Sequence, residues 1–235
     1  MHNDTTRTKS PAASTFKNAA RVQVSFVTAA EKRALAWFAA HMPSWVSSDH
    51  LTILGFLAQI MVGVSYALSR YDRHWLLWGV LFLAINWFGD SLDGTVARFR
   101  NRQRPRYGFY VDHVIDAIGS TVLMAGLALS GYMSSLIALA LLIAFLLLSI
   151  EVYLATYTIG SFHLSFFNLG PTEIRIVLAI GNIALYARGP WTHIAGHTFL
   201  LFDVGAMIAI IGMLAMFLYA AIRHTAQLYR EERLP

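Results

Sequence analysis

Long apolar runs alternate with short polar connectors along most of the chain after Pro43. A hydrocarbon layer of about 30 Å needs roughly 20 helical residues to cross it, and six of the runs approach or exceed that length. The runs cover residues 51–69, 75–97, 111–132, 134–158, 171–188 and 199–222. This pattern predicts an all-α integral membrane protein with six transmembrane helices.

The region before these runs has a different character. Residues 1–28 are rich in Ser, Thr, Ala and Lys and offer little that could form a core, which predicts a mobile tail. Residues 29–47 place Leu35, Trp37 and Phe38 near one expected helical face. The pattern favours an N-terminal juxtamembrane amphipathic helix, followed by a connector, although an ordinary soluble helix fits this segment equally well.

Basic residues predict the orientation in the membrane. Most Lys and Arg residues lie in the N-terminal region, the 98–110 loop and the end of the chain, whereas the opposite connectors hold Arg70, Arg73 and Arg188. The positive-inside rule therefore places both termini in the cytoplasm. The expected location is the cell membrane or inner membrane. The expected domains are a six-helix transmembrane catalytic domain over residues 48–224 and a cytoplasmic tail over residues 225–235.

Composition narrows the classes of function. The chain is 57% hydrophobic and 13% charged, far from the average of soluble proteins. Its 18 Lys and Arg residues against 13 Asp and Glu residues favour contact with anionic lipid or phosphorylated substrates, and so apolar a chain is not expected to bind nucleic acid polymers. Because there is no cysteine, a metal ion would be held by oxygen or imidazole.

Four aspartates interrupt the apolar pattern. Asp90 and Asp93 are spaced i, i+3 at the end of the second run, and Asp112 and Asp116 are spaced i, i+4 at the start of the third. Each pair shares one helical face, and the short loop between the runs makes the two helices antiparallel neighbours. The four carboxylates are therefore expected to converge near the cytoplasmic interface.

Such a cluster requires positive charge, since four carboxylates cannot all stay ionised together in a low-dielectric site. Oxygen ligands select Mg²⁺, Mn²⁺ or Ca²⁺. We expect Mg²⁺, with two ions bound and Mn²⁺ as a substitute. Paired metal ions are a standard clamp for displacement at phosphorus.

Small residues and one arginine accompany the acids. Gly94 and Ala97 keep the helix surface low, so that a ligand can approach the backbone, and Gly108 does the same on the opposite helix. Arg98 can offer a planar fork to phosphate oxygens. The other arginines of the loop are expected mainly to anchor it to anionic lipid.

This segment resembles the signature of the CDP-alcohol phosphotransferases, D-x-x-D-G-x-x-A-R followed by G-x-x-x-D-x-x-x-D. All eight fixed positions are filled, by Asp90, Asp93, Gly94, Ala97, Arg98, Gly108, Asp112 and Asp116. The resemblance implies six transmembrane helices preceded by a juxtamembrane amphipathic helix and a site open to the cytoplasm. It also implies a CDP-alcohol lipid donor, a small alcohol acceptor and a homodimer.

The resemblance also implies a role for each signature residue. The core metal ligands would be Asp90, Asp93 and Asp112. Asp116 would contribute to the second metal and serve as the catalytic general base. The CDP pocket would be lined by Asp93, Gly94, Ala97, Arg98 and Gly108.

One part of the family pattern is altered. Many members carry Pro-Asn before Leu-Thr at the start of the first span, whereas this chain reads Ser-Asp-His-Leu-Thr over residues 48–52. The Leu-Thr pair is kept and the Asn is not, which leaves a nucleotide contact from Asp49 or Thr52 open. The implied reaction is transfer of a phosphatidyl group from CDP-diacylglycerol to an acceptor hydroxyl, with release of CMP.

Ionisable residues elsewhere on the cytoplasmic half are candidates for the acceptor pocket, because intramembrane charges are often functional, although structural pairing is an equal alternative. They are Glu151, Glu173, Arg175 and Arg106. If Arg175 and a loop arginine face the cavity, a polyol phosphate such as glycerol phosphate or inositol phosphate is favoured. Glutamates together with Tyr153 and Tyr157 would instead favour choline, ethanolamine or serine.

Two other functions use the same acids. A pyrophosphate hydrolase would take water as the acceptor. A divalent-cation transporter would need acids near the bilayer midplane, whereas these lie at helix ends beside a basic loop.

Overall fold

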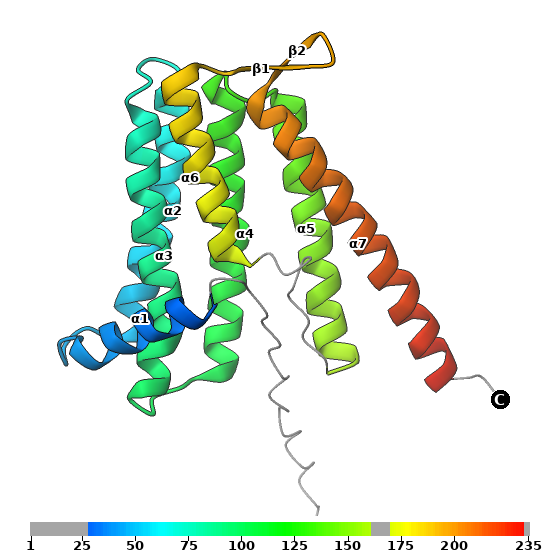
Figure 1. Ribbon diagram of the computed structural model, residues 1–235. Helices are drawn as coiled ribbons and strands as arrows, with labels where there is room; N and C mark the ends of the chain where they lie inside the picture. Colours follow the sequence, from blue (N-terminus) through cyan, green and yellow to red (C-terminus); the bar gives the residue numbers. More distant parts are fainter. Residues whose placement is uncertain (1–27, 161–169, 233–235) are drawn as a thin grey trace, which may run out of the picture.

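The computed structural model describes residues 28–160 and 170–232, shown in colour in Figure 1. The predicted mobile tail and most of the connector between the fourth and fifth predicted spans lie outside the described residues. Seven helices and one β-hairpin are described, in the order α1 Thr28–His41, α2 Ser48–Ser69, α3 Trp75–Phe99, α4 Pro105–Ser130, α5 Ser135–Thr158, α6 Pro171–Arg188, β1 Trp191–Ile194, β2 His197–Leu200 and α7 Leu201–Glu231.

Five of these helices, α2, α3, α4, α5 and α7, are long and apolar enough to cross a membrane. Helix α6 coincides with the fifth predicted run, but Glu173 and Arg175 in its first turns interrupt the apolar sequence. The prediction of an all-α integral membrane protein is confirmed at this level, and the count of six crossings stays a prediction.

The connection between α3 and α4 is shorter than predicted. The sequence indicated a loop over residues 98–110, yet α3 continues to Phe99 and α4 begins at Pro105. Proline is favoured at the first helical position, where its missing N–H costs nothing. Hydrophobicity alone does not detect this polar first turn. Arg106 and Gly108 consequently lie on α4 and not in a loop.

A two-stranded hairpin between α6 and α7 was not predicted. Its strands are antiparallel, with Trp191 opposite Leu200. Ala195 and Gly196 form the turn, with φ values of 51° and 84°, as a two-residue hairpin turn requires. The hairpin lies at the end of the bundle opposite the α3–α4 loop (Figure 1).

Helix α2 packs against both α3 and α4, and α6 packs on α3 (Figure 1). Glycines let the backbones touch, as is common between membrane helices. A Cβ atom on Gly126 of α4 would lie 2.0 Å from the carbonyl oxygen of Gly63 on α2. One on Gly89 of α3 would lie 2.6 Å from the backbone nitrogen of Gly55 on α2. These contacts hold both acid-bearing helices against α2.

Helices α5 and α7 form a second unit, and α5 also contacts α4. Polar contacts join α5 and α7 near both ends. Asp203 of α7 accepts hydrogen bonds from the backbone nitrogen and hydroxyl of Ser134, the residue before α5, at 2.8 and 2.5 Å. Toward the other end, Glu151 Oε1 of α5 and His224 Nδ1 of α7 lie 2.6 Å apart.

Helix α1 crosses the end of the bundle that carries the α3–α4 loop (Figure 1). Leu35 and Ala39 are buried against Leu92 and Val96 of α3. Trp37 is 57% exposed, so the prediction that it shares a face with Leu35 was wrong. Two residues along a helix turn about 200°, which puts Trp37 on the opposite side.

The contact between α2 and α4 generates a test of the fold. Gly126→Ala should lower the free energy of unfolding by about 1–3 kcal/mol, because the added methyl group meets the Gly63 carbonyl and forces the helices apart. Thermal unfolding of the detergent-solubilised protein, followed by tryptophan fluorescence, measures the loss. The matched control is Gly205→Ala on α7, where a Cβ atom meets nothing within 4 Å. Equal melting temperatures for the two variants would contradict the described crossing.

Candidate active site

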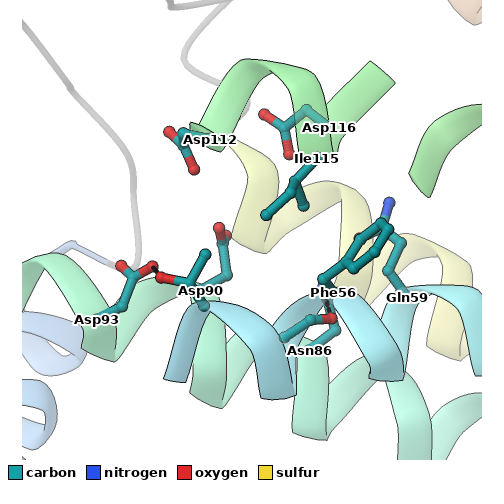
Figure 2. A pocket seen from close by; sticks show the side chains of 10 residues that line it. Phe56, Gln59, Asn86, Asp90, Asp93, Asp112, Ile115 and Asp116 are labelled. Atoms are coloured by element: carbon teal, nitrogen blue, oxygen red, sulfur yellow. Dashed lines mark hydrogen bonds between the residues drawn. The ribbon is translucent and has the colours of Figure 1, made fainter. Parts of the chain in front are cut away.

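The four predicted aspartates line one pocket between α2, α3 and α4. Its wall consists of Thr52, Gly55, Phe56, Gln59, Asn86, Asp90, Asp93, Asp112, Ile115 and Asp116. Figure 2 shows Asp112 and Asp116, from α4, facing Asp90 and Asp93, from α3, across this pocket. The predicted convergence of the two pairs is therefore present in the fold.

Asp93 is oriented by two donors on its two oxygens. The Thr52 hydroxyl donates to Oδ2 at 2.6 Å, and the backbone N–H of Gly94 donates to Oδ1. Thr52 Oγ1 also lies 3.1 Å from the carbonyl oxygen of Ser48, one turn earlier in α2. The Leu-Thr pair that matched the family pattern thus brings a hydroxyl from α2 onto an acid of α3.

Asp90 is paired with an arginine from another helix. Arg175 Nη2 of α6 donates to Asp90 Oδ2 at 2.5 Å, and Arg175 Nε donates to Asn86 Oδ1 at 2.7 Å. Asn86 Nδ2 donates in turn to the carbonyl oxygen of Gly55 at 2.9 Å. One of the four negative charges of the pocket is therefore balanced by a protein cation.

Next to Asp112, His113 turns toward α5. Its Nδ1 atom lies 2.5 Å from the carbonyl oxygen of Phe109. Its ring meets the Tyr153 ring edge-on, with 4.4 Å between the centroids. His113 is accordingly not among the residues that line the pocket.

The donor set fits a hard divalent cation, because four carboxylates from two helices enclose one pocket and no thiolate is available. Within residues 28–160 and 170–232, no three His, Asp or Glu side chains lie close enough together to hold an ion as they stand. The reason is visible in Figure 2, where one pair lies on each side of the pocket. The ligand types therefore suit a divalent cation, but the carboxylates of the two helices lie too far apart in this structure to coordinate one ion together.

Asp93 is the member of the predicted CDP-binding set that lines this pocket. Arg98 follows just over one turn later, and its guanidinium donates to Thr95 Oγ1 at 3.1 Å. A Cβ atom on Gly94 would lie 3.3 Å from Arg98 Nη1, so a larger residue there would push against the guanidinium. Ala97 is half-buried on α3 and Gly108 is exposed on α4.

The four predicted acceptor residues are placed differently. Arg175 forms an ion pair with Asp90, which lines the pocket. Glu173 is buried and accepts from the Gly170 N–H at 2.9 Å, which caps the start of α6. Glu151 is buried against His224, and Arg106 is exposed at the start of α4.

Two loop arginines have structural partners that the sequence did not indicate. Arg100 donates to three carbonyl oxygens of the α1–α2 connector, those of Met42, Pro43 and Val46. Arg104 is paired with Asp49. The expectation that these arginines serve mainly as lipid anchors is wrong for Arg100, whose guanidinium is bound to the backbone. Asn86 was missed as a site residue, since a single Asn in an apolar helix carries no spacing signal, and Thr52 had been considered only for a nucleotide contact.

Comparison with known proteins covers the residues of the pocket and most of the chain. The model of the CDP-alcohol phosphatidyltransferase family matches residues 45–226. The archaetidylinositol phosphate synthase of Methanothermobacter thermautotrophicus is 28% identical over 144 residues, which cover 61% of this chain and 70% of the relative.

Two shorter matches have related names. The archaetidylinositol phosphate synthase of Pyrococcus horikoshii is 30% identical over 37% of this chain and 43% of the relative. The phosphatidylinositol phosphate synthase of Streptomyces avermitilis is 34% identical over 36% of this chain and 32% of the relative. The chain therefore matches less than half of the length of these two relatives.

The carboxylate pocket predicts a stabilising effect of divalent cations. Mg²⁺ or Mn²⁺ at about 100 times its dissociation constant should add about 2.7 kcal/mol to the unfolding free energy, which corresponds to about 5–10 °C in melting temperature. Asp112→Asn should remove most of this shift, because it deletes a charged ligand. Melting curves with EDTA and with each cation measure it.

The control for this experiment is Asp72→Asn. Asp72 lies in the α2–α3 turn, where the backbone N–H of His74 keeps the pKa of its carboxyl below the usual range. This variant should keep the full cation shift. A shift equally large in Asp112→Asn would show that the cation binds elsewhere.

Proposed function

Because the chain belongs to the CDP-alcohol phosphatidyltransferase family, we propose that it transfers a phosphatidyl group from CDP-diacylglycerol to the hydroxyl of a small acceptor and releases CMP. The observation that carries this proposal is the pocket in which the four signature aspartates of α3 and α4 face one another. Family membership makes the chain a transferase of phosphate-containing groups, in place of the cation transporter that the acids alone allowed.

In the proposed reaction Asp116 accepts the proton of the acceptor hydroxyl. The acceptor oxygen attacks the phosphorus that carries the lipid alcohol, a new phosphorus–oxygen bond forms, and the bond to CMP breaks. Bound divalent cations, two Mg²⁺ ions in this proposal, would neutralise the pyrophosphate charge. Asp90, Asp93, Asp112 and Asp116 are the proposed ligands, and donors on Asp90 and Asp93 already fix the α3 half of the set.

The cytidine diphosphate is proposed to bind beside Asp93, along the small-residue surface of α3. Gly94 and Ala97 leave the backbone accessible there, and Arg98 supplies a planar donor for phosphate oxygens. Gly108 leaves open space on the facing helix, since a Cβ atom there would meet nothing within 4 Å. Together these four residues form the proposed nucleotide surface.

A polyol phosphate, with inositol phosphate foremost, is the proposed acceptor. The relatives named above are synthases of archaetidylinositol phosphate and phosphatidylinositol phosphate, which supports this choice. An aminoalcohol acceptor has less support, because Glu151 is bound to His224 and Glu173 caps its own helix. The exposed Arg106 stays a proposed contributor from the start of α4.

The membrane arrangement completes the proposal. We place six crossings in a catalytic domain over residues 48–224, with α6 as the fifth and α1 lying in the membrane interface. The position of α1 across the end of the bundle supports this arrangement (Figure 1). Both termini and the pocket would face the cytoplasm, and the family resemblance favours a homodimer.

The role of Asp116 can be tested by substitution. Asp116→Asn should reduce acceptor-dependent CMP release from CDP-diacylglycerol about 10²–10⁴-fold, because the amide cannot take the proton. The assay is CMP release by purified protein with Mg²⁺, together with the mass of the lipid product. Asp72→Asn should retain the wild-type rate. Full activity in Asp116→Asn would remove this residue from the mechanism.

The acceptor can be identified with a panel of alcohols. Wild-type protein should release CMP with inositol phosphate, and at least about tenfold more slowly with serine, ethanolamine or choline, because none of these three carries the phosphate group that arginine is proposed to bind. Glycerol phosphate tests whether any polyol phosphate suffices. CMP release without an added alcohol would instead support a hydrolase, and a preference for an aminoalcohol would overturn the proposed acceptor.

A further inference from the structure

Arg175 of α6 bridges two side chains of α3 through one guanidinium group. Two of its nitrogens are used, with Nε on Asn86 Oδ1 and Nη2 on Asp90 Oδ2. The Arg175 side chain is 14% exposed, and Asn86 is 4% exposed. This arrangement is a planar fork that bridges an amide and a carboxylate, which fixes the guanidinium plane.

The orientation of the fork originates in the α2–α3 crossing. Asn86 and Asp90 are spaced i, i+4 on α3, so both face the same side. Asn86 Nδ2 donates to the Gly55 carbonyl, which is within reach because Gly55 and Gly89 allow the two backbones to touch. The amide therefore presents its oxygen, and not its nitrogen, to Arg175.

A guanidinium held in this way fixes one oxygen of Asp90. With Oδ2 bound to Nη2, rotation of the carboxylate would break a charge-assisted hydrogen bond. Asp93 is fixed in the same manner by Thr52 and the Gly94 N–H. The α3 pair is thus oriented by donors from α2, α3 and α6.

We propose that Asn86 and Arg175 are positioning residues, which orient Asp90 as a ligand and so set the affinity for divalent cations. The proposal rests on the proposed function for the identity of the bound cation. It gives Arg175 a duty distinct from acceptor binding, and it brings in Asn86, which lies outside the signature. Groups that orient metal ligands typically change metal affinity about 10–100-fold when they are removed.

The experiment measures Mn²⁺ binding to the full-length protein in detergent by electron paramagnetic resonance of free Mn²⁺. Asn86→Ala and Arg175→Lys should each weaken binding about tenfold. Lysine keeps the positive charge but cannot bridge two partners. The double variant should bind little more weakly than either single variant, because both substitutions break one array. The Michaelis constant for the acceptor should stay within about twofold of the wild-type value in Asn86→Ala.

The matched control is Tyr66→Phe. It also removes a buried polar contact between α2 and α6, the hydrogen bond from Tyr66 to Asn182, but touches no aspartate. This variant should bind Mn²⁺ as the wild type does. If Asn86→Ala does not fold, Arg175→Lys alone decides the question. Unchanged Mn²⁺ affinity in Arg175→Lys, with a raised Michaelis constant for the acceptor, would overturn the positioning role.

These outcomes are separable from the fate of the proposed function. If wild-type protein releases no CMP but the two variants bind Mn²⁺ more weakly, the positioning role stands and the transferase proposal fails. If CMP release is confirmed and all variants bind Mn²⁺ equally well, the transferase proposal stands and the positioning role fails.

Discussion

The direct contact of helix backbones at glycines is the constraint on which the site depends. Helix α2 contributes no carboxylate to the pocket, yet it touches α3 at Gly55 and Gly89 and α4 at Gly63 and Gly126. Because the backbones touch at these glycines, the two acid-bearing helices are held close to α2. The Gly55 contact also brings a backbone carbonyl within reach of Asn86, so the same crossing that packs the fold orients a polar group of the site.

Electrostatics then explains the groups around the pocket. Four carboxylates at the edge of an apolar bundle repel one another, and each needs a donor or a cation. The α3 pair receives its donors from Thr52, the Gly94 N–H and Arg175. The remaining negative charge is what a divalent cation would compensate. The largely buried Arg175, near the start of α6, is therefore explained by the acid that it faces.

The sequence predicted the elements with long-range regularity and missed those that depend on single contacts. Apolar runs located the spanning helices, and the spacing of Asp90, Asp93, Asp112 and Asp116 located the pocket. The polar first turn of α4 and the β-hairpin were not predicted, because neither has a periodic pattern of apolar residues. The partners of Glu151 and Arg175 were not predictable either, since each depends on which helix lies opposite, and only packing determines that.

The fastening of α5 to α7 has a mechanical consequence. Two helices joined near both ends, by Asp203 at Ser134 and by His224 at Glu151, cannot tilt independently without breaking one of these contacts. The α5–α7 pair contacts α4 through Tyr153, whose ring meets that of His113, the residue next to Asp112. A tilt of α7, such as a thinner or thicker bilayer imposes, would therefore move α5 as well and change the Tyr153–His113 contact beside Asp112.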